Sequence, residues 1–332
     1  MNHPGPTTDP VPLPTVRAVV VTWNGLHLIR PCLDSLLAQD LERGLEVVVV
    51  DNASSDGTAE MLAELYPQVE VRVTAENLGF AGGVEVGLAG LSTDYAVLLN
   101  NDATFEPDAV RRLVDHLEAP GHERVGAVTA KIVLTEHDAD GRTLVNSTGN
   151  VLTRTGAATD RDWSALDGSE STDVEVFGFC GGAAALRATA LAEAGGFDAS
   201  LFLYYEDTDL SWRMRAAGWD IHYVARALAR HQHAASSDAA SPLFRYYNTR
   251  NSLLVFGRHA PLGAVILSHA RQTAALLQHS LRRSEPPTLL RARLRALLDV
   301  ARLLPRTARQ RRTTWTGRAA LRRTVYRDGL RP

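Results

Sequence analysis

The stretch that decides the fold is Val16-Arg17-Ala18-Val19-Val20-Val21-Thr22-Trp23-Asn24-Gly25. It begins as a run of β-branched residues and ends on an Asn-Gly turn signal, the pattern of a short buried strand. Apolar residues then recur at helical spacing, at Leu28, Ile29, Cys32, Leu33, Leu36 and Leu37. A strand followed closely by an amphipathic helix predicts the first half of a βαβ unit.

The same alternation continues along the chain. Further strands are expected at residues 47–50, 69–73 and 95–99, and helices at 58–65 and 80–91. Short apolar strands separated by helices predict an α/β fold with a mostly parallel central sheet and right-handed crossovers. Ligands bind such sheets beyond the carboxyl ends of the strands, so the loops after Val21, Val50 and Leu99 should lie together.

The second half is less regular. Residues 135–173, rich in Thr, Ser, Asp and Gly, predict a long irregular excursion. A strand is expected at 174–179, helices near 188–194 and 207–217, and a strand at 221–224. From residue 241 the pattern is helical to the end, with breaks expected at Pro286-Pro287 and Pro305.

Composition narrows the class of protein. The chain has 332 residues, of which 45% are apolar, enough for a large core and too many for a wholly disordered chain. Cys32 and Cys180 are its two cysteines, which excludes a disulfide framework and predicts a reducing, cytoplasmic compartment. Residues 1–15 contain five prolines and no apolar run, so they predict a disordered leader and not a signal peptide. The most apolar stretch, 262–277, contains His269, Arg271 and Gln272 and is too polar to span a membrane.

Charge is unevenly distributed. Residues 281–332 hold 15 arginines and three acids, a net charge of +12, within a chain whose total is −3. The segment also has an apolar stripe at helical spacing, flanked by arginines, the pattern of an interfacial helix. An anionic membrane surface contacted by 285–332 and a solvated helix face are equally compatible with this pattern, whereas nucleic acid is not expected. The stripe could instead pack on the rest of the chain or on a second copy. Its members are Leu289, Leu290, Leu294, Leu297, Leu298, Ala301 and Leu304, with Arg291, Arg293, Arg295, Arg302 and Arg306 beside them.

Polar residues follow three of the expected strands, in the segments 22–24, 51–58 and 100–102. Each segment alone is weak evidence for a ligand site, because an Asp after a strand is often a helix N-cap, as Asp51 could be. Glu206 and Asp207 similarly suit a helix N-terminus, where acids favour the macrodipole. Three polar strand ends on one edge of a sheet nevertheless predict a ligand site.

These segments resemble family 2 glycosyltransferases of the GT-A fold, and most of all the rhamnosyltransferase-like branch. The resemblance covers residues 16–251 and is carried by seven ordered motifs. They are V-V-T-W-N (20–24), V-D-N-A-S-S-D-G-T (50–58), E-N-L-G-F-A-G-G (76–83), L-L-N-N-D (98–102), F-C-G-G-A (179–183), G-G-F-D (195–198) and Y-E-D-T-D-L-S-W-R (205–213). The glycine run at 79–83 is not a dinucleotide fingerprint, which disfavours hydride chemistry.

The resemblance implies roles for individual residues. Donor-binding residues would be Thr22, Asn24, Asp51, Asn77, Gly79, Asn100 and Asn101, with Asp51 accepting hydrogen bonds from the base. Asp102 and His233, the latter preferred over His231, would hold one Mg²⁺ or Mn²⁺ ion. Asn100 stands where many relatives have a first acid, so Asp102 is the sole carboxylate of the metal motif.

For catalysis, the resemblance makes Asp207 the general base and lets Glu206 help hold the acceptor. Asp209 is expected to tether its helix. Cys180 is expected to be a small buried residue in the floor of the site.

The resemblance implies an inverting glycosyltransferase that uses a nucleotide-sugar donor. The favoured donor is dTDP-rhamnose, with UDP-galactofuranose as the alternative, and the acceptor would be a hydroxyl of a glycan or a lipid-linked saccharide. A nucleotidyltransferase-like enzyme and a non-catalytic nucleotide-sugar-binding protein are the rival classes. The implied organisation is a leader (1–15), a catalytic domain (16–251) with a nucleotide-binding half (16–105) and an acceptor half (106–251), and a basic helical extension (252–332). A lipid-linked acceptor would place the protein on the inner face of the plasma membrane.

Overall fold

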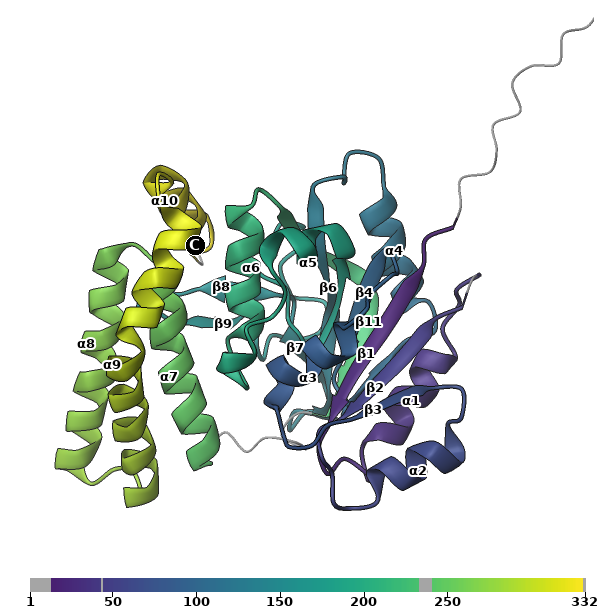
Figure 1. Ribbon diagram of the computed structural model, residues 1–332, viewed down its shortest axis with the longest axis horizontal. Helices are drawn as coiled ribbons and strands as arrows, with labels where there is room; N and C mark the ends of the chain where they lie inside the picture. Colours follow the sequence, from purple (N-terminus) through teal and green to yellow (C-terminus); the bar gives the residue numbers. More distant parts are fainter. Residues whose placement is uncertain (1–12, 43, 233–240, 331–332) are drawn as a thin grey trace, which may run out of the picture.

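The computed structural model describes residues 13–42, 44–232 and 241–330 (Figure 1). Helices cover both faces of one large sheet, and a separate group of helices lies at one end of it. The strands are β1 (Val16–Thr22), β2 (Glu46–Asp51), β3 (Glu70–Val73), β4 (Tyr95–Leu99), β5 (Ala103–Phe105), β6 (Val125–His137), β7 (Thr143–Ser147), β8 (Asn150–Leu152), β9 (Ala158–Asp160), β10 (Ala183–Arg187) and β11 (Asp220–His231). The helices are α1 (Ile29–Leu37), α2 (Thr58–Leu65), α3 (Gly79–Leu88), α4 (Ala109–Glu118), α5 (Ala188–Ala194), α6 (Glu206–Ala216), α7 (Pro242–His259), α8 (Leu262–Arg282), α9 (Pro287–Trp315) and α10 (Ala319–Asp328), with a 3₁₀ turn at Ala199–Leu201.

The sheet is parallel in its first half and mixed in its second. Its strand order is β3-β2-β1-β4-β10-β6-β11-β5, and β7 pairs with β6. Strands β1 to β4 pair in parallel, β10 runs antiparallel to both β4 and β6, and β11 is parallel to β6. The predicted α/β class is therefore confirmed. The carboxyl ends of β1, β2 and β4 lie at one edge of the sheet.

Alternation along β1 shows how the sequence builds the two sides of the core. Val16, Ala18 and Val20 face the helices α1, α2 and α4, whereas Val19 lies in the cluster formed with α3, α5 and α6. Side chains alternate between the two faces of a strand, so a strand covered by helices on both faces needs apolar residues at every position. This requirement explains the uninterrupted valine run.

Residues 135–173 are more ordered than expected. The long strand β6 continues to His137, and β7, β8 and β9 follow, so the predicted irregular excursion is wrong. These strands are short and polar, yet Asn146, Ser147 and Asn150 are buried. Their polar groups are satisfied internally: Asn150 Nδ2, for example, donates to the Phe179 carbonyl at 2.9 Å.

Other boundaries also differ from the expectation. Residues 174–179 form no continuous strand and contribute only isolated bridges, Glu175 to His222 and Gly178 to Asn150. Strand β11 extends beyond 221–224 to His231. Pro305 lies inside α9 without ending it.

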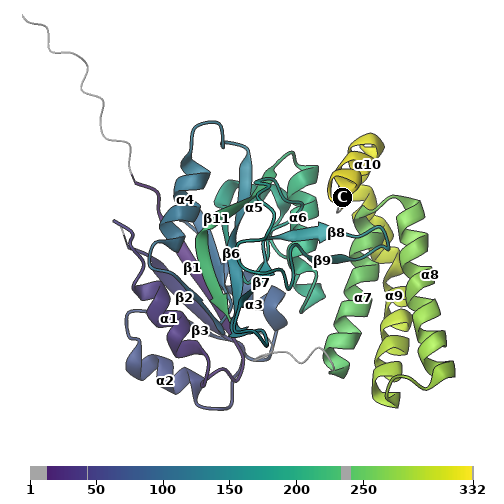
Figure 2. The ribbon, with the colours of Figure 1, turned by 180° about the vertical axis from the view of Figure 1, so that it is seen from behind.

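The C-terminal helices pack tightly on the rest of the chain, as Figures 1 and 2 show from opposite sides. Helix α7 runs through the boundary predicted at 251/252, and its Phe256 and His259 rings contact Trp212 of α6. Trp315 of α9 donates to His259 Nδ1 at 3.1 Å. None of the described helices is long and apolar enough to cross a membrane.

Candidate active site

The ends of β1 and β4 are joined by their polar residues. Asn101 Nδ2 donates to Thr22 Oγ1 at 3.0 Å, and both side chains are buried. Between them lies Gly25, where an added Cβ would stand 2.2 Å from Thr22 Oγ1. The backbone of β2 is tied to the same place, because the Asn52 amide donates to the Thr22 carbonyl at 2.8 Å. The sequence prediction that these strand ends meet is correct.

Asp51 is buried, with one carboxylate oxygen engaged in a hydrogen bond and the other without a described donor. Its side chain is 1% exposed, and Ser54 Oγ donates to Oδ1. Among the described residues, none donates a hydrogen bond to Oδ2. A buried acceptor without a partner is costly, so it marks a place where a ligand donor is missing. Asn24 sits beside it, with Oδ1 accepting from the Ser55 amide at 2.8 Å.

Asn77 and Gly79 shape the entry to α3. Asn77 Oδ1 accepts from the Gly79 amide at 2.8 Å, which fixes the turn. Gly79 has φ +70°, and an added Cβ would lie 2.3 Å from the Phe202 carbonyl oxygen. That same carbonyl accepts from the Ala81 amide at 3.1 Å. Only glycine permits this approach, which brings the predicted donor segment against the segment that precedes α6, the helix of the predicted base Asp207.

Asp102 is paired with a histidine from the far end of β11. His231 Nε2 lies 3.0 Å from Asp102 Oδ1, and His231 Nδ1 lies 2.5 Å from Asn146 Oδ1. Asp102 is buried and His231 half-buried. The structure thus places His231 beside Asp102, whereas the preferred His233 lies outside the described residues. Asn146 was not predicted, because its place in the site arises only from the pairing of β6 with β7.

Asn100 connects the metal motif to the catalytic loop. Its amide donates to the Gly182 carbonyl at 3.0 Å, and its side-chain nitrogen would lie 3.3 Å from a Cβ added at Gly182. The neighbouring Gly181 amide donates to Asp207 Oδ2 at 3.2 Å. The segment 181–182 therefore spans from the end of β4 to the start of α6.

Asp207 and Glu206 form the first turn of α6. Asp207 accepts from the Thr208 amide at 2.6 Å as well as from Gly181. Burial raises the pKa of Asp207 above that of an ordinary aspartate, and these hydrogen bonds to the ionised form limit the rise. Burial, together with the adjacent Asp207 charge, raises the pKa of Glu206 well above its usual value. No described donor reaches Glu206 Oε2, which is buried.

Two further residues belong to this acidic group. Burial raises the pKa of Asp160 on β9 to about 6, with a further upward contribution from the charge of Asp207. Burial and the charges of Asp160 and Asp207 raise the pKa of the Cys180 thiol well above its ordinary value, which disfavours a thiolate nucleophile. Asp160 had no sequence signal, since it lies in the stretch expected to be irregular.

A strained segment leads into α6 and is held by α7. Phe202, Tyr204 and Tyr205 all have φ between 66° and 71°, a backbone region that costs about 1–3 kcal/mol for each residue other than glycine. Asn251 Nδ2 lies 2.8 Å from each of three carbonyl oxygens in this region, those of Leu201, Leu203 and Tyr204. Asn251 is fully buried, so its amide supplies the bonds that keep the segment in place.

Asp209 anchors α6, as the sequence predicted. Its Oδ1 accepts from Arg258 at 3.0 Å and lies 2.9 Å from His259 Nε2, while Arg213 contacts Oδ2 at 2.8 Å. Burial alone would raise the pKa of Asp209, but Arg213, His259 and Arg258 together hold it well below its usual value. The neighbouring acids of α6 thus have opposite electrostatic environments: Asp209 is neutralised, whereas Glu206 and Asp207 face no cation in the described contacts.

A sheet that gathers polar residues at the carboxyl ends of its strands, near a pair of acids at a helix start, has the arrangement of an α/β ligand-binding site with candidate catalytic groups. Comparison with known proteins gives the family. Residues 18–194 match the model of glycosyl transferase family 2, and the chain belongs to that family as a glycosyltransferase.

Relatives extend the likeness over most of the chain. An N-acetylglucosaminyl-diphospho-decaprenol L-rhamnosyltransferase of Mycobacterium tuberculosis is 29% identical over 308 residues, covering 83% of this chain and 96% of the relative. A pre-mycofactocin glycosyltransferase of the same species is 25% identical, over 80% of this chain and 55% of that protein.

Solved structures share the fold. A mannosyltransferase from Pyrobaculum calidifontis, in complex with GDP-mannose and Mn²⁺, has a TM-score of 0.53 at 20% identity, covering 97% of this chain and 88% of that one. GalNAc-T7, with UDP, GalNAc and Mn²⁺, has a TM-score of 0.60 at 14% identity, over 86% of this chain and 54% of that chain. At these identities the likeness concerns the fold, which is the predicted GT-A fold.

Proposed function

We propose that the protein transfers L-rhamnose from dTDP-rhamnose to a hydroxyl of a lipid-linked saccharide, with inversion at the anomeric carbon. The transferred sugar and the lipid-linked acceptor are those in the name of the L-rhamnosyltransferase that aligns with 83% of this chain, and the dTDP donor is the one that the sequence motifs favour. The observation that carries the reaction type is the partly buried Asp207 carboxylate at the start of α6, held by the Gly181 amide next to the segment that contacts the end of β4.

In the proposed reaction, Asp207 accepts the proton of the acceptor hydroxyl as its oxygen attacks the anomeric carbon. The new carbon–oxygen bond forms while the bond to the diphosphate oxygen breaks, and dTDP leaves with that electron pair. A positioned base typically accelerates such a step by about 10²- to 10⁴-fold. Attack from the face opposite the diphosphate requires one base, so the product is inverted.

On the donor side, Asp51 Oδ2 would accept the imide N–H of the thymine ring. Thr22, Asn24 and Asn101 surround the same strand ends and would border the nucleoside. Asn77, Gly79 and Asn100 would complete this group chiefly through the backbone they fix.

A divalent metal fits the residues around Asp102. A buried carboxylate with an imidazole 3.0 Å away and an amide oxygen nearby offers the oxygen and nitrogen ligands that Mn²⁺ accepts, and Mg²⁺ is the alternative. The two solved structures named above contain Mn²⁺. We propose Asp102 as the protein carboxylate that holds the ion, with His231 or His233 beside it. When bound, the ion neutralises charge on the diphosphate.

The C-terminal helices suggest where the acceptor is met. On α9, Leu294, Leu298 and Leu304 are each at least 50% exposed. The side chains of Arg295 and Arg302 are also more than 70% exposed. An exposed apolar row with neighbouring arginines suits the interface of an anionic membrane. We propose peripheral contact of this face with such a membrane.

The structure narrows the face that can make this contact. Leu289 is buried and Leu297 packs against α7, so these two residues of the predicted stripe face the protein interior. Arg293, predicted to flank the stripe, is buried and forms a two-point ion pair with Glu285, at 2.8 and 2.9 Å. Its guanidinium is occupied inside the protein because Glu285 and Gln272 surround it, so Arg293 is excluded from the proposed membrane contact.

The test is a donor panel with the full-length chain. dTDP-rhamnose, UDP-galactofuranose, UDP-N-acetylglucosamine and GDP-mannose are each incubated with a polyprenyl-diphosphate N-acetylglucosamine acceptor, and both glycolipid product and nucleoside diphosphate are measured. We expect product from dTDP-rhamnose alone, loss of product in EDTA, and recovery with Mg²⁺ or Mn²⁺. Product from UDP-galactofuranose instead would overturn the donor assignment, and full activity in EDTA would overturn the metal.

A further inference from the structure

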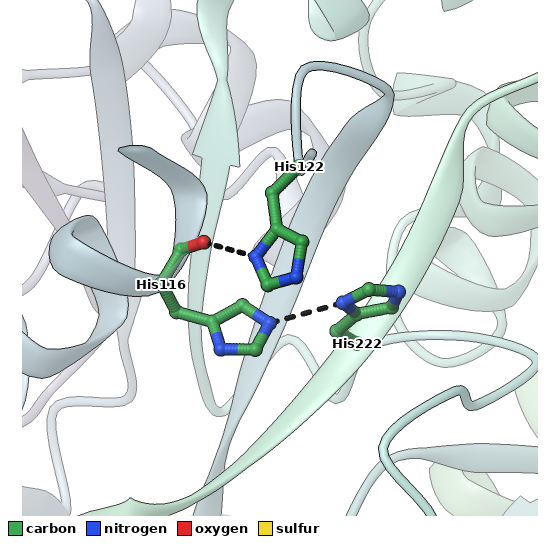
Figure 3. A group of neighbouring side chains, drawn as sticks. All are labelled: His116, His122 and His222. Atoms are coloured by element: carbon green, nitrogen blue, oxygen red, sulfur yellow. Dashed lines mark hydrogen bonds between the residues drawn. The ribbon is translucent and has the colours of Figure 1, made fainter. Parts of the chain in front are cut away.

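Three histidines meet at the edge of the sheet opposite Asp102. His116 lies in the last turn of α4, His122 in the turn before β6, and His222 near the start of β11 (Figure 3). His231, the histidine beside Asp102, is at the other end of the same strand β11. The β6 residues paired with His222 and His231, Val128 and Leu134, are six residues apart, roughly 20 Å, so the two places are distinct.

The ring nitrogens of the three histidines converge. One nitrogen from each ring lies within 4.8 Å of the others. His116 Nε2 and His222 Nδ1 are 3.0 Å apart. Figure 3 shows the three rings directed at one another, with the second nitrogen of His122 facing the other two rings. A tetrahedral ion with metal–nitrogen distances of about 2.0–2.1 Å holds its ligand nitrogens roughly 3.4 Å apart, close to the spacing already present.

The tautomer of His122 is fixed by the backbone. Its Nδ1 lies 2.6 Å from the His116 carbonyl oxygen, which can only accept, so Nδ1 carries the proton. The lone pair of His122 is therefore on Nε2, the nitrogen that faces the cluster. A hydrogen bond from the outer nitrogen to a carbonyl is the usual support of a metal-ligating histidine.

The surroundings favour neutral imidazoles, the form that binds metals. Burial, then the neighbouring His122 and His222, lowers the pKa of His116 to about 4. Burial also lowers the pKa of His222, aided by His122 and Arg215 and opposed by Asp220 and Glu175. All three rings are only half-buried, so an ion can enter from solvent.

We propose that His116, His122 and His222 form a binding site for one first-row transition-metal ion, Zn²⁺ foremost, with water or an exogenous ligand at the fourth position. Imidazole ligands suit Zn²⁺, Ni²⁺ and Cu²⁺, whereas Mg²⁺ requires oxygen ligands, so this site selects differently from the one around Asp102. The ion would join the end of α4 and the 119–124 turn to β11 and so stabilise that edge of the sheet.

The test uses the full-length chain without a histidine tag, stripped of metal and kept in excess Mg²⁺. Zn²⁺ is titrated by calorimetry, Co²⁺ by visible absorption, and thermal unfolding is recorded with and without Zn²⁺. The variants are His116→Ala and His222→Ala, and the matched control is His137→Ala, an exposed histidine near the other end of β6. Circular dichroism and nucleoside diphosphate release with Mg²⁺ show that the variants are folded.

We expect one Zn²⁺ per chain with Kd on the order of 10⁻⁷ M or tighter, a tetrahedral Co²⁺ spectrum, and a Zn²⁺-dependent rise in Tm. His116→Ala and His222→Ala should weaken binding by at least about tenfold and abolish the Tm rise, while His137→Ala behaves as the parent. The proposed site is wrong if the parent and all three variants bind Zn²⁺ equally. It is also wrong if the parent binds no Zn²⁺ at about 10⁻⁵ M, 100-fold above the expected Kd. Donor transfer in Mg²⁺ does not depend on this result.

Discussion

As the proposed general base, Asp207 must be shielded from water and must also be ionised to accept a proton. Because its pKa is raised, activity should fall as the pH drops through a value above the usual aspartate range. Asp207→Asn keeps the shape but cannot take the proton. We expect kcat to fall by about 10²- to 10⁴-fold, while the Kd for dTDP, measured by calorimetry, changes less than about threefold. Near-normal turnover would remove Asp207 as the base.

Glu206 offers a test by stability. Its raised pKa means that the folded state binds the proton more tightly than the unfolded state, so its contribution to stability is present at low pH and lost as pH rises. Glu206→Gln removes the cost of keeping an ionised carboxylate at this buried position. We therefore expect the free energy of unfolding to increase by about 1–3 kcal/mol at pH 7, with little change at pH 4. The exposed Glu64→Gln is the control and should leave Tm unchanged at both pH values.

Asp51 is predicted to act in binding and not in chemistry. The contact to the base is present in both the ground state and the transition state, so Asp51→Ala should raise the donor KM by about 10-fold or more and change kcat by less than about threefold. Ser54→Ala releases Oδ1 of Asp51 and removes the acceptor of the Asn24 amide, but keeps the Asp51 carboxylate, so it should give a smaller rise in KM. A collapse of kcat with unchanged donor affinity would exclude Asp51 as a ligand of the base.

The sequence was informative for residues that sit in ordered motifs and uninformative for those recruited by tertiary contact. Asp51, Asp102 and Asp207 follow strands or begin a helix in recognisable segments, and the structure places them as expected relative to those elements. Asn146 and Asp160 come from the polar strands β7 and β9, which pair with the adjacent strands β6 and β8. Their neighbours in the site, His231 and Asp207, are distant in sequence. No local pattern distinguishes a buried, hydrogen-bonded Thr-Ser-Asn strand from a loop.

At the scale of elements, the apolar pattern predicted strand bounds best where helices cover both faces of the strand. β1 and β4 have the predicted bounds because helices cover both of their faces, which forces continuous apolar runs. Helix α5 likewise matches its expected bounds. In contrast, β11 was predicted too short, since its later half alternates between buried and exposed residues and carries arginines.

Helix α7 is expected to control the catalytic segment through Asn251. Asn251→Ala removes the amide shared by three carbonyl oxygens, of which that of Leu201 keeps Arg250 Nη2 as a donor at 3.1 Å, and loosens a segment that contains residues at positive φ. We expect a loss of about 2–3 kcal/mol in the free energy of unfolding and a fall in kcat of about 10- to 100-fold. Asn248→Ala, on the same helix, is the matched control. If Asn251→Ala lowers Tm but leaves kcat unchanged, the residue supports the fold without positioning the site.

At the scale of the whole molecule, the chain separates an acidic body from a basic group of helices. The arginines of the extension divide into two groups with different roles. Arg293 and Arg311 are engaged internally, with Glu285 and with the carbonyls of Gly257 and Ala260, and they join the helices of the extension to one another. Arg295 and Arg302 project from α9 beside the exposed leucines. Arg295 and Arg302 also pair with Asp299 but keep most of their side-chain surface in solvent, so they remain accessible to an anionic surface.

This division determines how membrane contact should be tested. Removing the chain after Arg283 would also remove α9, whose Val300 and Trp315 are buried against α7 and its neighbours, so loss of binding by that truncation could simply report unfolding. Point substitutions on the exposed face avoid this problem. We therefore compare Leu294→Ser/Leu298→Ser/Leu304→Ser with a control that changes leucines equally exposed on the nucleotide-binding half, Leu37→Ser/Leu65→Ser.

Co-sedimentation with vesicles of anionic and of zwitterionic lipid provides the measurement. We expect the parent and the Leu37/Leu65 control to bind anionic vesicles at low salt and to be released by high salt, because exposed charges are screened. The Leu294/Leu298/Leu304 variant should bind at least about tenfold more weakly, since each leucine contributes about 1 kcal/mol or more of apolar burial. Equal binding by both variants would place the contact elsewhere. No binding by the parent would leave α9 as a packing element and favour an acceptor that is met in solution.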